Sequence, residues 1–312
     1  MSLNRTTPMA AGLGTGIYFA VAEQFTHFGT LQLNGEEVPN PTDQHLDSSI
    51  TQLVAGYSIT PRLAVQIDLP LIFRSFQRPR GFAIEHGSES GIGDASLLAN
   101  LNAIRWEKGG SRSVAFDDPK SPRIQVTPAE VVFVLDLFSG IKGPSGSTDR
   151  LKEEFHEVEI PGAPVSGIHG HDLALGTGSS DGFFGGQAAV RYRNVFLESG
   201  LQFTLRGDGE HQYHFANDLS WSGGPGYYFI RSGGKRFGVQ FVISGEYKDV
   251  DRFRGKAAED TGVTSVFAGP RVFASFKNVS ADIAADLPVS IDNTALQAVA
   301  DYRIRGAVSW HF

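Results

Sequence analysis

The sequence predicts an all-β protein, a single antiparallel transmembrane β-barrel of twelve strands in an up-and-down meander. Three observations predict it: a long amphipathic strand at the end of the chain, connections of alternating length, and a composition rich in glycine and phenylalanine. In residues 297–312, every second residue counted back from Phe312 is uncharged, whereas the intervening set holds Asp301, Arg303, Arg305 and His311. Because successive side chains of a strand point to opposite faces, this segment has one apolar and one polar face.

The length of this final strand favours a membrane. Strands of soluble proteins usually have about five or six residues, whereas a tilted strand that crosses a bilayer and projects beyond it is longer. Bacterial outer-membrane barrels characteristically end their closing strand with Phe, so Phe312 is expected to be the C-terminal signal that the barrel-assembly machinery reads. The alternative for this strand alone is the last strand of a soluble sandwich.

The composition narrows the class of protein. The chain has 312 residues with 37 Gly, 23 Phe and no Cys, so disulfides and thiol chemistry are excluded. Its net charge of −7 argues against nucleic acid as a partner. No apolar run approaches the roughly eighteen residues of a membrane-spanning helix. No cofactor is expected.

The N-terminal segment, residues 1–14, opens with Met-Ser-Leu-Asn-Arg-Thr-Thr-Pro and has no apolar signal core. Either a signal peptide has been removed or the protein is not exported. The barrel prediction requires the first alternative, and this segment is then expected to lie in the periplasm. The whole chain, 1–312, is expected to form one domain in the bacterial outer membrane, with lipid as its surroundings.

Twelve strands alternate with turns. The predicted strands are 16–28, 46–58, 63–73, 91–104, 126–142, 184–192, 195–206, 212–229, 236–248, 263–276, 279–289 and 297–312. Short connections (59–62, 193–194, 232–235 and 277–278) alternate with longer polar ones, of which 143–178 is the longest. Outer-membrane barrels have short periplasmic turns and longer extracellular loops, and a sandwich has no reason to sort its loops in this way. The connection 106–125 is the exception, because it is long where a short one is expected.

The polar face of each strand is expected to point into the barrel, since lipid offers no hydrogen-bond partners. Acids and bases are balanced there, which suggests internal ion pairs. The residues expected to line the lumen are Asp68, Arg74, Glu130, Asp136, Arg191, Glu198, Arg206, Glu246, Arg271, Asp282, Asp301, Arg303 and Arg305. Twelve strands enclose more space than the eight whose side chains just fill the interior, so the lumen is either a narrow wet channel or one plugged by the 143–178 loop.

Several short motifs resemble the MetA-pathway of phenol degradation family of outer-membrane proteins. They are Asp-Leu-Pro-Leu at 68–71, Gly-Ile-Gly-Asp at 91–94, Gly-Ile-Lys-Gly-Pro-Ser-Gly at 140–146, Leu-Gly-Thr-Gly-Ser-Ser-Asp at 175–181, and Phe312. They occur in order over nearly the whole chain. The resemblance implies a porin-like channel for passive diffusion of small solutes, aromatic or hydrophobic ones among them. Gly143 and Ser145 depart from the family's usual Lys-Leu-Pro-Thr-Gly strand end. The family name alone does not identify phenol as the solute.

Other functions are less well supported by the residues. His169 and His171 in the long loop, and His211 and His214 near 212, are metal-capable, but two flexible ligands seldom make a site, so no metal is expected. The acidic run 149–159 suits a solvated surface better than calcium. An outer-membrane phospholipase would need a serine where Ala216 follows His214, so no enzyme is expected. The remaining alternative is a structural barrel with a plugged lumen that docks a protein partner.

Overall fold

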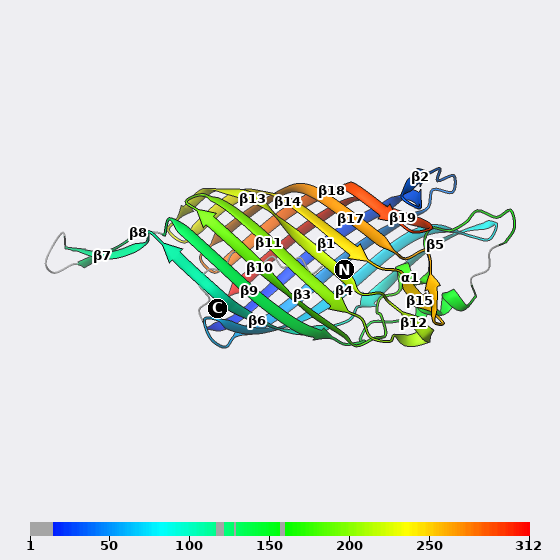
Figure 1. Cartoon of the computed structure of the whole chain (residues 1–312), viewed down its shortest axis with the longest axis horizontal. Helices are drawn as coiled ribbons and strands as arrows, with labels where there is room; N and C mark the ends of the chain where they lie inside the picture. Colours follow the sequence, from blue (N-terminus) through cyan, green and yellow to red (C-terminus); the bar gives the residue numbers. More distant parts are fainter. Residues whose placement is uncertain (1–14, 117–121, 128, 157–159) are drawn as a thin grey trace.

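The computed structural model describes residues 15–116, 122–127, 129–156 and 160–312. The expected periplasmic segment, 1–14, lies outside the described residues. Within the described chain, twelve long strands form one antiparallel sheet that closes on itself, as predicted (Figure 1). In chain order the barrel strands are β1 (Gly16–Leu33), β3 (His45–Ser58), β4 (Leu63–Arg80), β6 (Ser96–Lys108), β9 (Val131–Lys142), β10 (Asp181–Tyr192), β11 (Val195–Leu205), β13 (Asp218–Ser232), β14 (Lys235–Lys248), β17 (Val263–Phe276), β18 (Val279–Asn293) and β19 (Leu296–His311).

Closure of the barrel depends on the final strand, whose alternation dominates the sequence. Strand β19 pairs with β1 from His311 opposite Tyr18 to Leu296 opposite Leu33. This ladder satisfies the backbone groups that an open sheet edge would expose to lipid. It is interrupted near Phe28 by a bulge, and the same register resumes beyond it with Thr30 opposite Val299.

Connections sort by length at the two ends of the barrel. The short-turn end holds tight turns such as Arg193-Asn194 and Lys277-Asn278, in which Arg193 and Lys277 adopt left-handed φ values of 53° and 52°. The long-loop end holds the connections 34–44, 81–95, 143–180, 206–217 and 249–262. Each end has one exception: the β7 (Ser111–Phe116) and β8 (Pro122–Thr127) hairpin projects from the short-turn end, and only residues 294–295 join β18 to β19.

Two predicted strand boundaries were wrong for the same reason. Residues 126–127 belong to the separate β7–β8 hairpin, so the barrel strand β9 begins only at Val131. The connection expected between the predicted strands 63–73 and 91–104 is largely strand, because β4 continues past the barrel and pairs with β5 (Ala83–Ile92) as a long hairpin. Strand β2 (Glu36–Val38) extends β1 in the same way. Polar alternation alone does not show where a strand leaves the barrel wall.

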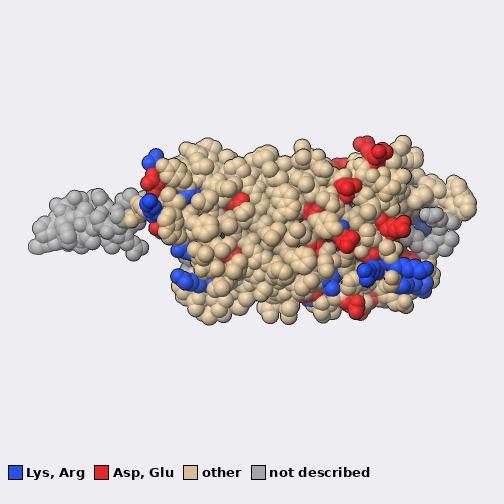
Figure 2. All heavy atoms as spheres, in the orientation of Figure 1, with Lys and Arg blue, Asp and Glu red and all other residues tan. Residues whose placement is uncertain are grey.

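The outer wall is apolar over its middle. On β4, for example, Ile67 and Phe73 are 56% and 52% exposed, whereas their inward neighbours Asp68 and Ile72 are buried. In Figure 2 the charged atoms gather toward the two ends, and the middle of the visible wall is largely uncharged. This is the apolar band that an outer-membrane barrel presents to lipid. No described helix has the length and apolar character required to span a membrane.

Glycine and aromatic residues are abundant for a structural reason. Aromatic rings of one strand lie flat against glycines of the next, where a side chain would collide with them. A Cβ atom on Gly56 would lie 2.1 Å from the Tyr18 ring, and one on Gly226 would lie 2.1 Å from the Phe196 ring. Such contacts fill the inner wall without distorting the ladder, a device known to stabilise glycine in sheets.

Candidate functional site

The barrel interior is built by the inward positions of the strands. Residues that stand opposite each other on neighbouring strands point to the same face of the sheet. Most of the residues predicted to line the lumen are on the inward face. The predicted residues on the inner face are Asp68, Arg74, Asp136, Arg191, Glu198, Arg206, Glu246, Arg271, Asp282, Arg303 and Arg305.

Two predicted lumen residues lie elsewhere. Glu130 precedes β9 at the short-turn end, where its carboxylate pairs with the exposed Arg193 at 2.8 Å. Asp301 lies at the β1–β19 bulge, so the strict alternation of the strand does not apply to it. Its carboxylate accepts a hydrogen bond from Thr30 at 2.6 Å and lies 3.5 Å from His27 Nε2. His27 continues the outward series of Val21 and Phe25, so Asp301 stands on the outer wall.

Inward charges of neighbouring strands are paired. Arg305 on β19 lies 2.6 Å from Asp286 on β18, and both are nearly buried. Arg271 on β17 reaches Asp282 on β18 at 3.0 Å and Glu198 on β11 at 3.8 Å. These pairs join adjacent and more distant strands across the inner face, as the charge balance of the sequence suggested.

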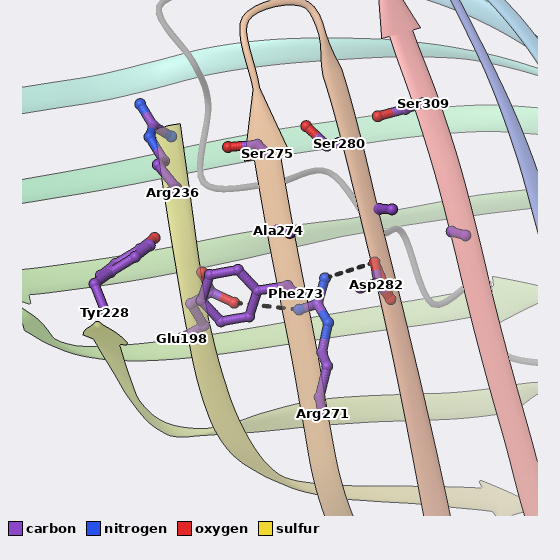
Figure 3. Close-up of a pocket in the computed structure, with 12 residues that line it drawn as sticks. Glu198, Tyr228, Arg236, Arg271, Phe273, Ala274, Ser275, Ser280, Asp282 and Ser309 are labelled. Carbon is purple, nitrogen blue, oxygen red and sulfur yellow. Dashed lines mark hydrogen bonds and ion pairs between the residues drawn. The ribbon is translucent and has the colours of Figure 1, made fainter. Parts of the chain in front are cut away.

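One cavity lies on this inner face in the half nearer the short turns. Figure 3 shows Arg271 between Glu198 and Asp282, with the rings of Phe273 and Tyr228 beside them. The Tyr228 ring centre lies 5.3 Å from that of Phe273. The cavity holds about 30 Å³, which is room for roughly one or two water molecules. It is therefore narrow and amphipathic, with one charged and one aromatic side.

The four internal motifs that carry the family resemblance meet at the long-loop end of the lumen. Asp94 accepts hydrogen bonds from the backbone N–H of Thr177 at 2.8 Å and from that of Gly146 at 3.0 Å. Lys142 donates to Asp94 at 3.2 Å and pairs with Asp181 at 2.7 Å. The backbone N–H of Gly93 donates to the Pro70 carbonyl at 2.8 Å. Segments far apart in the sequence thus build one junction between strands and loop.

Arg206 completes this junction. Its guanidinium lies 2.9 Å from Asp181 and 2.5 Å from Asp218, two carboxylates that are almost fully buried. Since buried charges are costly unless paired and hydrogen-bonded, this arrangement fixes the ends of β10, β11 and β13 relative to one another. Asp94 and Asp181 were not among the predicted site residues, although the motif Leu-Gly-Thr-Gly-Ser-Ser-Asp contained the signal for Asp181.

The long connection 143–180 folds as a cap at the long-loop end. It contains η1 (Asp149–Phe155) and α1 (Gly170–Leu173), and its residues Leu151, Ile168 and Leu173 are at most 1% exposed. Ile168 and Leu173 pack against Leu46 and Phe76 of the barrel strands β3 and β4. We call the described residues 147–156 and 160–176 the cap. Its apolar side chains are buried against inward positions of the wall, so the cap covers the mouth of the lumen.

Arginines fasten the cap to the β4–β5 hairpin. Arg78 on β4 donates to Glu85 at 2.9 Å and to Glu153 of η1 at 2.5 Å, and it is only 6% exposed. Arg150 of η1 pairs in turn with Glu89 on β5 at 2.5 Å. The β4–β5 hairpin, which the sequence suggested to be a polar connection, therefore holds the cap in place.

Histidines of the cap have structural partners. His171 lies 3.1 Å from Glu154 and 3.6 Å from Asp172, and His169 lies 3.3 Å from Asp260. Burial opposes protonation of His171, but the charges of Asp172, Glu154 and Asp260 outweigh it and raise the pKa of His171 to about 10. Among the described residues, no three His, Cys, Asp or Glu side chains gather as metal ligands.

A small sheet of β12 (Tyr213–His214), β15 (Asp251–Phe253) and β16 (Lys256–Ala258) supports the cap from the side. Asp251, fully buried, accepts hydrogen bonds from the Tyr213 hydroxyl and from Lys248, both at 2.8 Å. Burial and the charge of Asp251 raise the pKa of the Tyr213 hydroxyl. In the same region His214 faces Asp208 at 3.2 Å, and Asn217 accepts from the backbone of Arg206, so they do not form a catalytic pair.

Comparison with solved structures gives a fold relationship. An outer membrane channel from Pseudomonas putida F1 superposes with a TM-score of 0.58 at 16% identity, covering 96% of this chain and 97% of that one. The chain has an outer-membrane barrel fold. Together with the closed ladder and the apolar band, this places the protein in the bacterial outer membrane.

Weaker likenesses are to the beta domain of the Bordetella autotransporter BrkA and to the translocator domain of NalP from Neisseria meningitidis. Their TM-scores are 0.48 and 0.42, at 10% and 12% identity; they cover 96% and 97% of this chain and 100% and 90% of those chains. No family model matches the sequence. No curated protein sequence matches it either.

Proposed function

We propose that the protein is a narrow outer-membrane channel for passive diffusion of small solutes. The observation that carries the proposal is the inner wall, where ionised side chains from most strands stand in pairs around the barrel axis. A twelve-strand barrel encloses more space than side chains need to fill. Charges that pair along the wall leave a wettable lining, which a purely structural barrel does not require.

The amphipathic cavity supports a solute of mixed character. Tyr228 and Phe273 offer aromatic faces, and Arg236 and Arg271 offer donors close by. The chemical character of this lining matches aromatic or hydrophobic solutes with one polar end, in line with the resemblance to the phenol-degradation family. The family assignment itself belongs to this proposal, as does periplasmic placement of the short turns and of Phe312, where the barrel-assembly machinery would read the closing strand.

A second candidate is a closed barrel that docks a partner protein. The cap favours it, because Leu151, Ile168 and Leu173 are buried at the mouth of the lumen. The two candidates differ in whether ions pass when the cap is present and when it is removed.

Planar-bilayer conductance distinguishes them. The protein is compared with a variant in which residues 147–176 are replaced by a short Gly-Ser turn, since Lys142 and Asp181 already stand opposite each other on β9 and β10. We expect small discrete steps for the intact protein and larger steps for the variant. Silence from both folded proteins would refute the channel and favour the closed barrel. The rates at which liposomes swell in a panel of aromatic and aliphatic solutes then rank these solutes by their permeability.

A further inference from the structure

The outer wall of β1 carries a glutamate where lipid is expected. Outward positions on β1 are Ile17, Phe19, Val21, Glu23 and Phe25, and the first three are 49%, 46% and 40% exposed. Glu23 stands opposite Thr51 on β3 and Gly306 on β19. It therefore interrupts an otherwise apolar outward series.

The depth of Glu23 follows from β19. The outward residues of that strand run from Trp310 to Tyr302, and Gly306 is midway between these two aromatics. Trp and Tyr mark the two membrane interfaces of barrels and helices. Glu23, level with Gly306, thus lies near the centre of the apolar band.

Side chains of β3 satisfy part of the hydrogen-bonding capacity of the Glu23 carboxyl group. Ser49 donates to one oxygen of Glu23 at 2.5 Å, and Thr51 donates to the other. On the other side, Gly306 offers no side chain, and a Cβ atom there would approach only a backbone oxygen at 3.5 Å. The outward side of the carboxyl group is therefore open to whatever covers the wall, and hydrocarbon cannot bond to it.

Polar groups continue from Glu23 toward the long-loop end of the same wall. His27 lies 2.6 Å from Asp47 and 3.5 Å from Asp301, and its ring is 6.2 Å from that of His45. We call Glu23, His27, His45, Ser49, Thr51, Asp47 and Asp301 the polar stripe. On the nine described barrel strands outside β19, β1 and β3, outward charged side chains stand at strand ends, such as Lys108, Lys235 and Asp292.

We propose that the polar stripe is an interface between two copies of this chain within the membrane. In a symmetric pair whose axis is the membrane normal, each residue meets its counterpart at equal depth. The stripe complements itself at both levels: the hydroxyl groups of Ser49 and Thr51, which can donate and accept, stand beside the carboxyl group of Glu23, and the outer level contains imidazole donors beside Asp47 and Asp301. A second copy thus supplies a polar partner at the centre of the band, which lipid cannot.

Disulfide trapping tests the interface directly, because the chain has no cysteine of its own. Single cysteines are placed at Val21 or Phe25, which flank Glu23 on the outward face, and at Leu201 as a control on β11. After mild oxidation of outer membranes, we expect a two-chain product from Val21→Cys or Phe25→Cys and far less from Leu201→Cys. Equal yields at Val21, Phe25 and Leu201, or products of another mass, would overturn the proposal.

Variants at Glu23 then test the role of the carboxyl group. Glu23→Leu in the Val21→Cys background should lower the trapped fraction by about threefold or more, as expected for one hydrogen bond within a membrane. Glu23→Gln should retain trapping, because the amide keeps an acceptor oxygen at the same position. Ser199→Leu, an outward polar-to-apolar change on β11, is the matched control and should have no effect. Undiminished trapping in folded Glu23→Leu would show that the stripe does not hold the copies together. Conductance is not measured, so the outcome is independent of the channel proposal.

Discussion

Arg78 is predicted to hold the cap on the barrel. Its guanidinium, 6% exposed, bonds Glu85 on the β5 hairpin and Glu153 on η1, and it also donates to the Ile168 carbonyl at 3.3 Å. Replacement by Met retains much of the apolar stem and removes all of these bonds. Glu153 then retains Arg150 at 2.5 Å, whereas Glu85 retains only the more distant Arg80 at 3.6 Å and Arg150 at 3.8 Å.

The magnitude follows from burial. Removing one partner of a fully buried ion pair costs about 3–5 kcal/mol. Glu85 and Glu153 are 22% and 25% exposed, so water relieves part of the loss, and we expect about 2–3 kcal/mol. If only the cap is affected, its opening equilibrium rises by about 30- to 150-fold.

Hydrogen exchange of residues 149–156 and 168–175 measures this opening. Arg78→Met should accelerate exchange there by that factor and leave β9 and β10 protected. Arg80→Met is the matched control, because Arg80 is a near neighbour on β4 that reaches Glu85 only at 3.6 Å and is 64% exposed. Equal exchange in the two variants, or loss of protection throughout the barrel, would refute the assignment of Arg78 as a fastening of the cap.

Three further predictions concern the cap and the inner wall. Since the pKa of His171 is raised to about 10, its charged form stabilises the cap fully below about pH 6.5. This contribution, at most about 5 kcal/mol, is lost as the pH rises through 10. Hydrogen exchange of the cap should therefore accelerate over that pH range in the protein and not in His171→Gln. Leu173→Ala, at a site with no exposure, should destabilise the cap by about 2–5 kcal/mol while the thermal unfolding of the barrel is unchanged, which peptide-resolved exchange during heating checks. Replacing Arg303 and Arg305 with Glu should shift the reversal potential toward cation preference, whereas Arg193→Glu at the exposed rim should not; unchanged potentials would show that the two arginines do not line an open path.

Strand alternation predicted the barrel well because a barrel wall has only two faces. The twelve strands, their order and the apolar outer band follow from a period of two that lipid enforces. The same rule placed Asp282 and Arg305 on the inner face, where each has an opposite charge as partner. This part of the fold is local in the sequence, so a single chain suffices to predict it.

Features that break the alternation could not be predicted. Asp301 was expected inside, but the bulge beside Phe28 turns it toward His27 on the outer wall. Glu130 was expected inside because the strand was extended to 126, whereas the β7–β8 hairpin ends before it. A bulge and a protruding hairpin both preserve the polar pattern of the sequence while changing which face a residue occupies.

The cap was predicted only as a long loop, since its fold depends on contacts that the sequence does not pair. Arg78 and Glu153 are 75 residues apart and Asp94 and Thr177 are 83 apart, so nothing local indicates that they meet. The cap is held by these ionic and polar contacts together with the packing of Ile168 and Leu173 on the inner wall, whereas the wall is held by a closed backbone ladder. Because the two parts rest on different interactions, a change of charge can release the cap without opening the barrel. If the protein conducts, regulation of solute passage is therefore expected at the arginine and histidine contacts of the cap and not in the strands.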